Sequence, residues 1–82
     1  MITVLYFAKL KEVLGLNRQS LDFIEGESAL ALARRLVALG GQNWQVLLDE
    51  DIVYAVNQEV IERSHIVNDG DEVAFFPPVT GG

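Results

Sequence analysis

The 82-residue sequence contains no cysteine. This absence excludes disulfide bonds, thiolate metal sites, iron–sulfur clusters and a cysteine nucleophile. Any sulfur chemistry in which the chain takes part must therefore use sulfur that another molecule delivers.

Other residues that usually carry metal or catalytic chemistry are also scarce. His65 is the only histidine, and a lone histidine near a loop is more often a surface residue than a ligand or a base. The acidic clusters at residues 49–51 and 69–72 do not have the spacing of a calcium-binding loop, so solvated surface or a contact for a basic partner is the better interpretation. The sequence has no glycine-rich loop that cradles phosphate, and no nucleophile with an activating base. We therefore predict no metal and no stably bound cofactor.

Basic residues are few, with six lysines and arginines against twelve aspartates and glutamates. The formal net charge of −6 repels nucleic-acid phosphates and anionic membranes, so a basic protein partner is the better prediction. No apolar run reaches membrane-spanning length, and residues 1–8 lack the basic segment and cleavage site of a secretory signal. These features predict a cytoplasmic protein that binds neither nucleic acid nor membranes.

What the sequence has in quantity is apolar residues, which make up half of the chain, while 22% of the residues are charged. That composition is typical of a folded domain rather than of a disordered chain. A chain of this size forms one domain but has no room for both a core and a large catalytic cleft. We expect a single domain at residues 1–76 and an extended tail at residues 77–82.

Hydrophobic periodicity and turn residues predict the order of the secondary-structure elements. The predicted strands lie at residues 2–7, 18–24, 52–56, around 60–61 and at 72–76, with Asn57 and Gln58 as the turn before residues 60–61. The predicted helices lie at residues 8–14, at 29–39 with Ser28 as N-cap, and at 44–48 with Asn43 as N-cap, where Trp44 closes one end of the core. This order favours an α+β fold with one mixed sheet, its first and last strands adjacent in the middle and the long helix packed across one face.

The long helix divides into an apolar face and a polar face. Leu32, Leu36 and Leu39 recur at helical spacing and are expected to pack against the sheet. Arg34 and Arg35 fall on the other side of the helix, where solvated charges are the simplest interpretation.

The first and last strands are apolar on both faces, as expected for strands that are covered on both sides. One long helix can cover only one face of a sheet, so Phe7, Val60 and Phe76 are expected to stay partly exposed on the other. Contiguous exposed apolar surface in a small acidic domain is typical of a protein-binding site. We favour this interpretation over the alternative, in which loops cover the three residues and make them part of the core.

The sequence ends in a stiff apolar segment followed by two glycines. Pro77 and Pro78 favour extended backbone, and the tail at residues 77–82 could reach roughly 20 Å. Gly81 and Gly82 have no Cβ atom, so their backbone fits a channel too narrow for side chains. We predict that the carboxylate of Gly82 is the reactive group, which ATP could activate as an acyl-adenylate. The simpler alternative is a frayed, inert chain end.

Residues 69–82 closely resemble the end of the small, sulfur-carrying subunit of molybdopterin synthase. They have the sequence Asp-Gly-Asp-Glu-Val-Ala-Phe-Phe-Pro-Pro-Val-Thr-Gly-Gly. Residues 4–8, the leucine-rich helix and residues 55–58 fall where that family has its counterparts, so the similarity spans the whole chain. The resemblance implies the ubiquitin-like β-grasp fold, which agrees with the predicted order of elements.

The resemblance also implies a mechanism in which the chain donates sulfur and a partner subunit catalyses the chemistry. An E1-like adenylating enzyme would use ATP to activate Gly82, and a persulfide-bearing sulfur donor protein would convert the adenylate to a thiocarboxylate. The tail would then enter the large subunit of molybdopterin synthase. There the sulfur would pass to precursor Z, the cyclic pyranopterin monophosphate, during molybdenum cofactor biosynthesis.

The same resemblance indicates which residues bind the partners. Val79, Thr80 and Gly81 would occupy the tunnel of the large subunit, while an apolar seat would serve both partners. The partner-binding residues predicted on this basis are Phe7, Val60, Phe76, Pro77, Pro78, Val79, Thr80 and Gly81.

Two other classes of function remain open at this point. A sulfur carrier for thiamine synthesis or tRNA thiolation would share the fold and the Gly-Gly end, although the Phe-Phe-Pro-Pro segment is less expected there. A ubiquitin-like modifier joined to lysines through Gly82, or a β-grasp adaptor with an inert tail, is the alternative without sulfur chemistry.

Overall fold

The computed structural model describes residues 1–77 of the chain. Within them, helices and strands follow one another in the order that the sequence predicts. In chain order the elements are β1 (Ile2–Tyr6), α1 (Lys9–Leu14), β2 (Arg18–Leu21), α2 (Ala29–Gly40), the 3-10 helix η1 (Gln42–Leu48), β3 (Val53–Val56), β4 (Glu59–Val60) and β5 (Glu72–Phe76).

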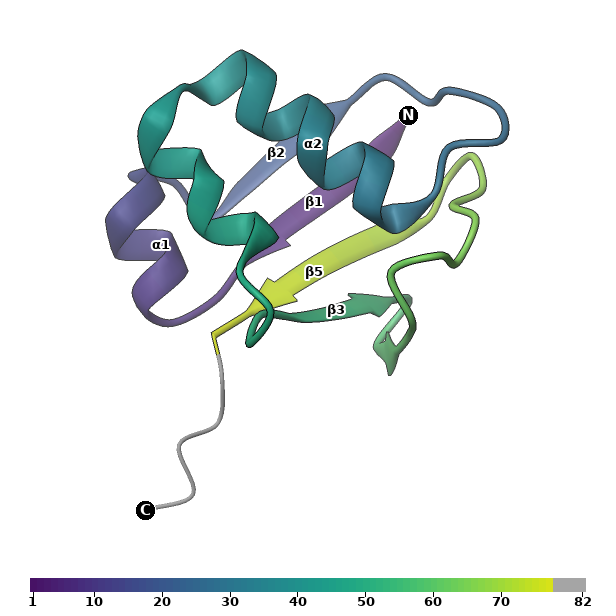
Figure 1. Cartoon of the computed structure of the whole chain (residues 1–82). Coiled ribbons are helices and arrows are strands. Elements are labelled where there is room, and N and C mark those ends of the chain that lie inside the picture. Colours follow the sequence, from purple (N-terminus) through teal and green to yellow (C-terminus); the bar gives the residue numbers. More distant parts are fainter. Residues whose placement is uncertain (78–82) are drawn as a thin grey trace.

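The strands of the described residues form one mixed sheet in the order β2-β1-β5-β3-β4. β1 and β5 are parallel, whereas the other neighbouring pairs are antiparallel. Figure 1 shows β1 and β5 side by side in the middle of the sheet. The predicted mixed sheet, with the first and last strands at its centre, is therefore confirmed.

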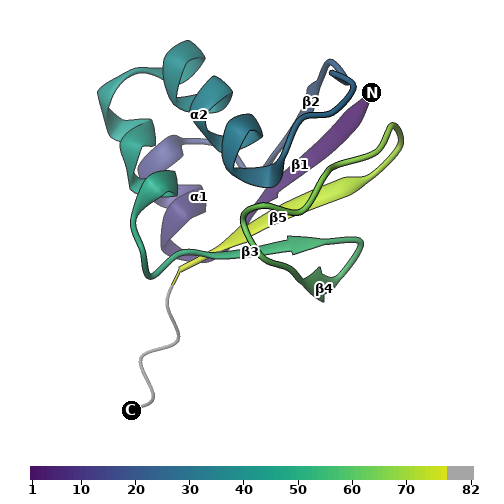
Figure 2. The same ribbon diagram turned by 45° about the vertical axis from the view of Figure 1, so that its right-hand side comes forward.

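α2 packs across one face of the sheet and supplies a large part of the core. It begins where predicted, because the Ser28 Oγ accepts a hydrogen bond from the backbone N–H of Ala31 at 3.1 Å. Leu32 and Leu36 are at most 1% exposed, so the predicted apolar stripe is confirmed at these two positions. In both views α2 and η1 lie on the same side of the sheet (Figures 1 and 2). Within residues 1–77, no helix is long and apolar enough to cross a membrane.

The prediction that Leu39 belongs to the same stripe is wrong, because its side chain is 72% exposed. The helical spacing continues the buried stripe from Leu36 to Gly40 rather than to Leu39. A Cβ atom at Gly40 would lie only 2.3 Å from the Trp44 side chain, so this glycine makes room for the indole ring. At the last turn of α2 the Trp44 ring therefore occupies the space that a side chain at position 40 would fill, and the neighbouring Leu39 is exposed to solvent.

η1 follows α2 directly and places Trp44 against the core. The Trp44 ring meets the Tyr6 ring edge-on, with centroids 5.4 Å apart, which confirms the prediction for the tryptophan. The prediction of Asn43 as N-cap is wrong, because the N-cap is Gly41 and no side chain caps this helix. Gly41 has a φ of 96°, a conformation that favours glycine and lets the chain turn from α2 into η1.

Two buried tyrosines in the core keep their hydroxyl groups hydrogen-bonded. The Tyr6 hydroxyl donates to Oε1 of Gln19 at 3.1 Å, and the Tyr54 hydroxyl donates to the backbone carbonyl of Leu47 at 2.5 Å. Burial raises the pKa of both phenols, although the nearby Arg63 guanidinium partly opposes this shift at Tyr54. Both tyrosines are therefore neutral at physiological pH and act as structural groups.

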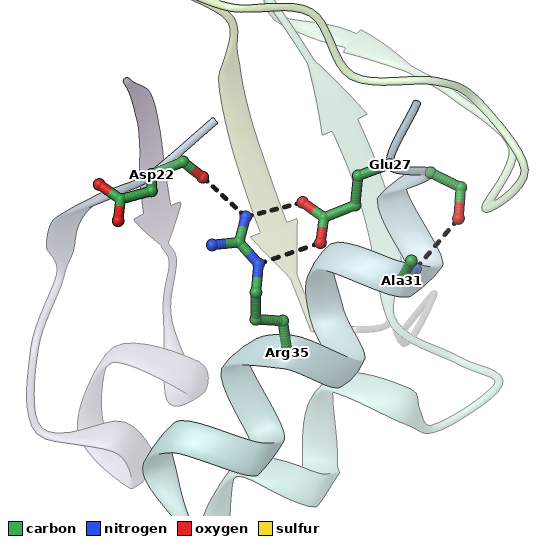
Figure 3. Close-up of polar contacts among 5 residues, drawn as sticks. Asp22, Glu27, Ala31 and Arg35 are labelled. Atoms are coloured by element: carbon green, nitrogen blue, oxygen red, sulfur yellow. Dashed lines mark hydrogen bonds and ion pairs between the residues drawn. The ribbon is translucent and has the colours of Figure 1, made fainter. Parts of the chain in front are cut away.

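The prediction of a solvated charge at Arg35 is wrong. Its Nε donates to Oε2 of Glu27 at 3.0 Å and one terminal NH2 group donates to Oε1 at 2.7 Å, which makes a bidentate pair (Figure 3). The same NH2 group donates to the carbonyl of Asp22 at 2.8 Å. The segment after β2, predicted to continue as a strand to residue 24, is thus held against α2 as a loop.

Replacement of Arg35 by methionine is expected to lower the free energy of unfolding by about 2 kcal/mol, between the values typical of exposed and of buried ion pairs. The loss arises because the Glu27 side chain, only 9% exposed, would keep a charge without a partner. Urea denaturation measures this difference. Arg34→Met is the matched control, since Arg34 is exposed on the same helix and should change stability by less than about 0.5 kcal/mol. Equal effects of the two substitutions would contradict the assignment.

Candidate functional site

No helix of residues 1–77 packs over the face of the sheet opposite α2 (Figure 2). In β1, Ile2, Val4 and Tyr6 are at most 2% exposed, whereas Thr3 and Leu5 on the other face are only half-buried. The sequence favours a strand covered on both sides, but residues 1–77 cover one side only. Apolar strand positions are therefore presented outward, on what is here called the open face.

Two aromatic side chains stand at one end of the open face. The rings of Phe7 and Phe76 are stacked, with centroids 4.6 Å apart and an angle of 4° between their planes. The backbone N–H of Phe7 donates to the carbonyl of Phe75 at 3.2 Å, which fixes the end of β1 beside the end of β5. Phe7 is nevertheless 39% exposed and Phe76 is half-buried. The pair is thus rigidly placed yet accessible.

An apolar hollow of about 570 Å³, here called the groove, lies beside this aromatic pair. Val60 of β4 forms part of its wall and is 75% exposed. The groove is lined by Leu5, Phe7, Ala55, Gln58, Val60, Glu72, Ala74 and Phe76. The structure thus brings together Phe7, Val60 and Phe76 and leaves all three accessible, as predicted; their binding of a partner stays a prediction.

The β3–β4 hairpin that carries Val60 is anchored to the sheet by Asn57. Asn57 and Gln58 form the turn that the sequence predicts, and both have positive φ angles, 51° and 71°. The Asn57 side chain accepts from the Glu72 N–H at 3.0 Å and donates to Oδ1 of Asp71 at 2.9 Å. These bonds join the turn to the start of β5, so the wall of the groove does not depend on the two-residue strand β4 alone.

β5 leads the chain out of the fold at the aromatic pair. Phe76 is the last residue of the strand and pairs with Val53, and Pro77, which follows, has no N–H to continue the ladder. The other predicted tail residues lie outside the described residues. They are Pro78, Val79, Thr80, Gly81 and Gly82.

A second, smaller hollow of about 320 Å³ adjoins the groove and is here called the cationic hollow. Leu5 and Phe7 line both hollows. The cationic hollow also contains Lys11 of α1 and Arg18 of β2, whereas the groove contains Glu72. Neither of the two ion pairs found within residues 1–77 involves these three charged residues. The apolar surface is thus flanked by charges of opposite sign.

Several residues around the open face were not predicted as site residues. Ala55 and Ala74 are small and were assigned only to strands, although alternation along the strands would have placed them beside the predicted aromatics. Glu72 was noted only as part of an acidic cluster and Gln58 only as part of a turn, and Arg18 gave no signal of its own, because single polar residues at the ends of strands resemble ordinary surface. Their place becomes visible only from the register of the sheet.

A metal site is not formed by the part of the chain that the structure describes. Among residues 1–77, no group of three or more histidine, cysteine, aspartate or glutamate side chains is placed to hold a metal ion. What the described residues offer is a contact surface beside a strand that leads the chain outward.

The fold and the open face define a small ubiquitin-like β-grasp protein. A solved structure of small archaeal modifier protein 1 from Haloferax volcanii is similar to this chain with a TM-score of 0.78 and 26% sequence identity. The similarity covers 95% of this chain and 97% of that one.

Curated relatives are similar over essentially the whole chain. A molybdopterin synthase sulfur carrier subunit from Escherichia coli is 40% identical over 85 aligned residues, covering 100% of both chains. A protein of the same name from Haemophilus influenzae is 38% identical, again with 100% of both chains covered. The model of the ThiS family matches residues 4–82. The chain belongs to the ThiS family, and the predicted resemblance and β-grasp fold are confirmed.

Proposed function

We propose that the chain is the sulfur carrier subunit of a molybdopterin synthase, and that the carboxylate of Gly82 carries the sulfur. Full-length similarity to sulfur carrier subunits of that enzyme supports the proposal. One observation of the structure carries it: β5 delivers the chain to the exterior at the stacked Phe7–Phe76 pair, beside the groove. A partner that docks on the open face would meet the start of the tail at the same place.

In the proposed charging reaction, a carboxylate oxygen of Gly82 attacks the α-phosphorus of ATP and pyrophosphate leaves. An E1-like adenylating enzyme supplies the active site for this step. The terminal sulfur of a persulfide then attacks the acyl carbon and AMP leaves, after which a thiol cleaves the sulfur–sulfur bond and leaves a thiocarboxylate. The absence of cysteine from the chain is consistent with this chemistry, because the sulfur is held on the backbone terminus. The proposal includes a cytoplasmic location, since charging consumes ATP.

In the proposed transfer reaction, the large subunit of molybdopterin synthase receives the charged tail and catalyses donation of its sulfur to precursor Z. Val79, Thr80 and Gly81 would pass through a narrow channel, for which glycine at position 81 suits the backbone. Phe7 and Phe76 would fill apolar pockets on the partner, as exposed aromatic anchors commonly do.

Intact-mass analysis of the chain produced together with its adenylating enzyme and sulfur donor tests the proposed charging reaction. We expect a product whose mass has increased by the exchange of one oxygen atom for one sulfur atom. Omission of the adenylating enzyme is the control and should leave the mass unchanged. A chain that remains unmodified in the complete mixture would contradict the proposal.

A second candidate function is that of a protein modifier joined to lysines through Gly82. The likeness to the archaeal modifier protein, at 26% identity and with the same fold, favours it. The same mass experiment separates the two candidates, because a modifier would appear as adducts of much higher mass. Loss of those adducts when Gly82 is deleted would assign the linkage to the terminus.

A further inference from the structure

We infer that the open face has a built-in electrical polarity that fixes the orientation of the docked partner. Its cationic side is marked by Arg18 and its anionic side by Glu72, and Lys11 of α1 adds a second positive charge to the hollow that Arg18 lines. The inference rests on the proposed function, because the partner concerned is the large subunit that receives the tail. It adds the chemistry of that partner's surface: an apolar centre with an acidic group on one side and a basic group on the other.

The register of the sheet places both charges on the open face. Arg18 lies directly opposite Leu5 on the neighbouring antiparallel strand, and Glu72 lies beside Thr3 on the parallel strand. Side chains at paired positions of adjacent strands project from the same face of a sheet. Thr3 and Leu5 are the half-buried, outward positions of β1, so the arginine and the glutamate flank them on the open face.

The two hollows separate the charges by sign. Among residues 1–77, the cationic hollow is lined by Lys11 and Arg18 and by no acidic residue, whereas the groove is lined by Glu72 and by no basic residue. Leu5 and Phe7, which line both, form the apolar ridge between them. Because the chain has only six basic residues and a formal net charge of −6, two cations in one hollow stand out from an acidic background.

A directional contact is needed because apolar burial is not directional. The groove and the aromatic pair could hold a partner in more than one rotation about the Leu5–Phe7 ridge, yet the tail must enter the partner in one direction. Opposite charges on the two sides of the ridge penalise the wrong rotation, which would bring like charges together. Charges at the rim of an interface also speed association through long-range attraction.

Charge reversal on each side of the ridge tests the inference. Binding is measured between the full chain in its carboxylate form, without the terminal sulfur, and the purified large subunit. We expect Arg18→Glu and Glu72→Lys each to weaken binding about 10-fold or more, mainly through slower association. Raising the ionic strength from about 0.1 M to about 1 M shortens the Debye length from about 10 Å to about 3 Å. The difference in affinity between each variant and the original chain should therefore become smaller. The neutral variants Arg18→Gln and Glu72→Gln should show the same effect at smaller size.

Matched controls carry the same change of net charge elsewhere on the surface. Arg34→Glu on α2 and Glu25→Lys on the loop after β2 both replace exposed residues that line neither hollow, and should change the affinity less than about two-fold. Unfolding curves for every variant exclude loss of structure as the cause.

Binding by the original chain together with unchanged affinity of the Arg18 and Glu72 variants would overturn the inference and leave the proposed function standing. Equal weakening by the control variants would also overturn it, because the effect would then reflect net charge alone. Failure of the original chain to bind the large subunit would instead overturn the proposed function, and this inference with it.

Discussion

Addition of one alanine after Gly82 is expected to abolish sulfur transfer while leaving the fold and its stability unchanged. β5 is fixed in the middle of the sheet by pairing on both sides, so the number of residues after Phe76 sets how far the terminus reaches. One more residue displaces the reacting carboxylate by about 3.5 Å. Misplacement of a reacting group by as little as about 1 Å can cost about 100-fold in rate, so a loss of at least that size is expected.

A reconstituted assay of sulfur transfer measures this effect, with thermal unfolding as the check on folding. Gly82→Ala is the companion variant, because it adds a Cβ atom but keeps the length of the chain. It separates the effect of a side chain in a narrow channel from the effect of displacement. Full activity of the lengthened chain would rule out the terminal carboxylate as the working group.

Replacement of Phe76 by alanine is expected to weaken binding of the large subunit by about 2 kcal/mol, roughly 30-fold, as is typical of aromatic residues at the centre of an interface. Phe76 is half-buried, and its main aromatic partner is the exposed Phe7. Loss of the pair and of a half-buried ring should therefore cost about 1–2 kcal/mol of folding stability, less than the about 3–5 kcal/mol of a fully buried phenylalanine. Calorimetric titration measures the affinity for the large subunit, and urea denaturation of the same protein preparation measures the free energy of unfolding.

The neighbouring residue gives an unusually close control. Phe75 points to the opposite face of β5, is completely buried, and packs against the rings of Tyr6 and Tyr54. Phe75→Ala should cost about 3–5 kcal/mol of stability, while leaving the open face itself unchanged in composition. A large fall in stability with unchanged affinity for Phe76→Ala would show that Phe76 is a core residue.

The order of elements and the centre of the sheet could be predicted from the sequence because their signals are local. β1 and β5 are short runs that are apolar on both faces, and the Ser28 side chain caps α2 only three residues further on. Asn57 and Gln58 adopt the positive φ angles of a tight turn, which is also a local property. The exposure of Phe7 followed from the same alternation, once only one long helix was available to cover the sheet.

The errors arose where a contact between two different structural elements decides the environment of a side chain. Leu39 is exposed rather than buried because Gly40 takes the position that faces the core and leaves room for Trp44. Periodicity alone cannot show that a glycine takes that position. Arg35 lies on the polar side of α2, but its environment is set by Glu27, eight residues earlier, which becomes a neighbour only when the loop folds back.

The candidate site was predictable in its apolar part and not in its polar part. Val60 stands out in the sequence as a hydrophobic residue of a brief strand after a turn. Glu72 and Arg18 look like surface charges until pairing with Thr3 and Leu5 assigns them to the open face. To predict which charges lie on the rim of such an interface, one thus needs the register of the sheet, which depends on the pairing of all its strands.

A single-turnover reaction of the purified thiocarboxylate form with the large subunit and precursor Z tests most directly whether the terminus of this chain is its working part. Mass spectrometry of the chain follows the loss of the sulfur atom from the donor, and quantification of sulfur in the pterin product follows its gain by the acceptor. We expect the chain to return to its carboxylate mass as sulfur appears in the pterin, one atom for each chain consumed. Sulfur that stays on the chain while the large subunit and the pterin are both bound would contradict it.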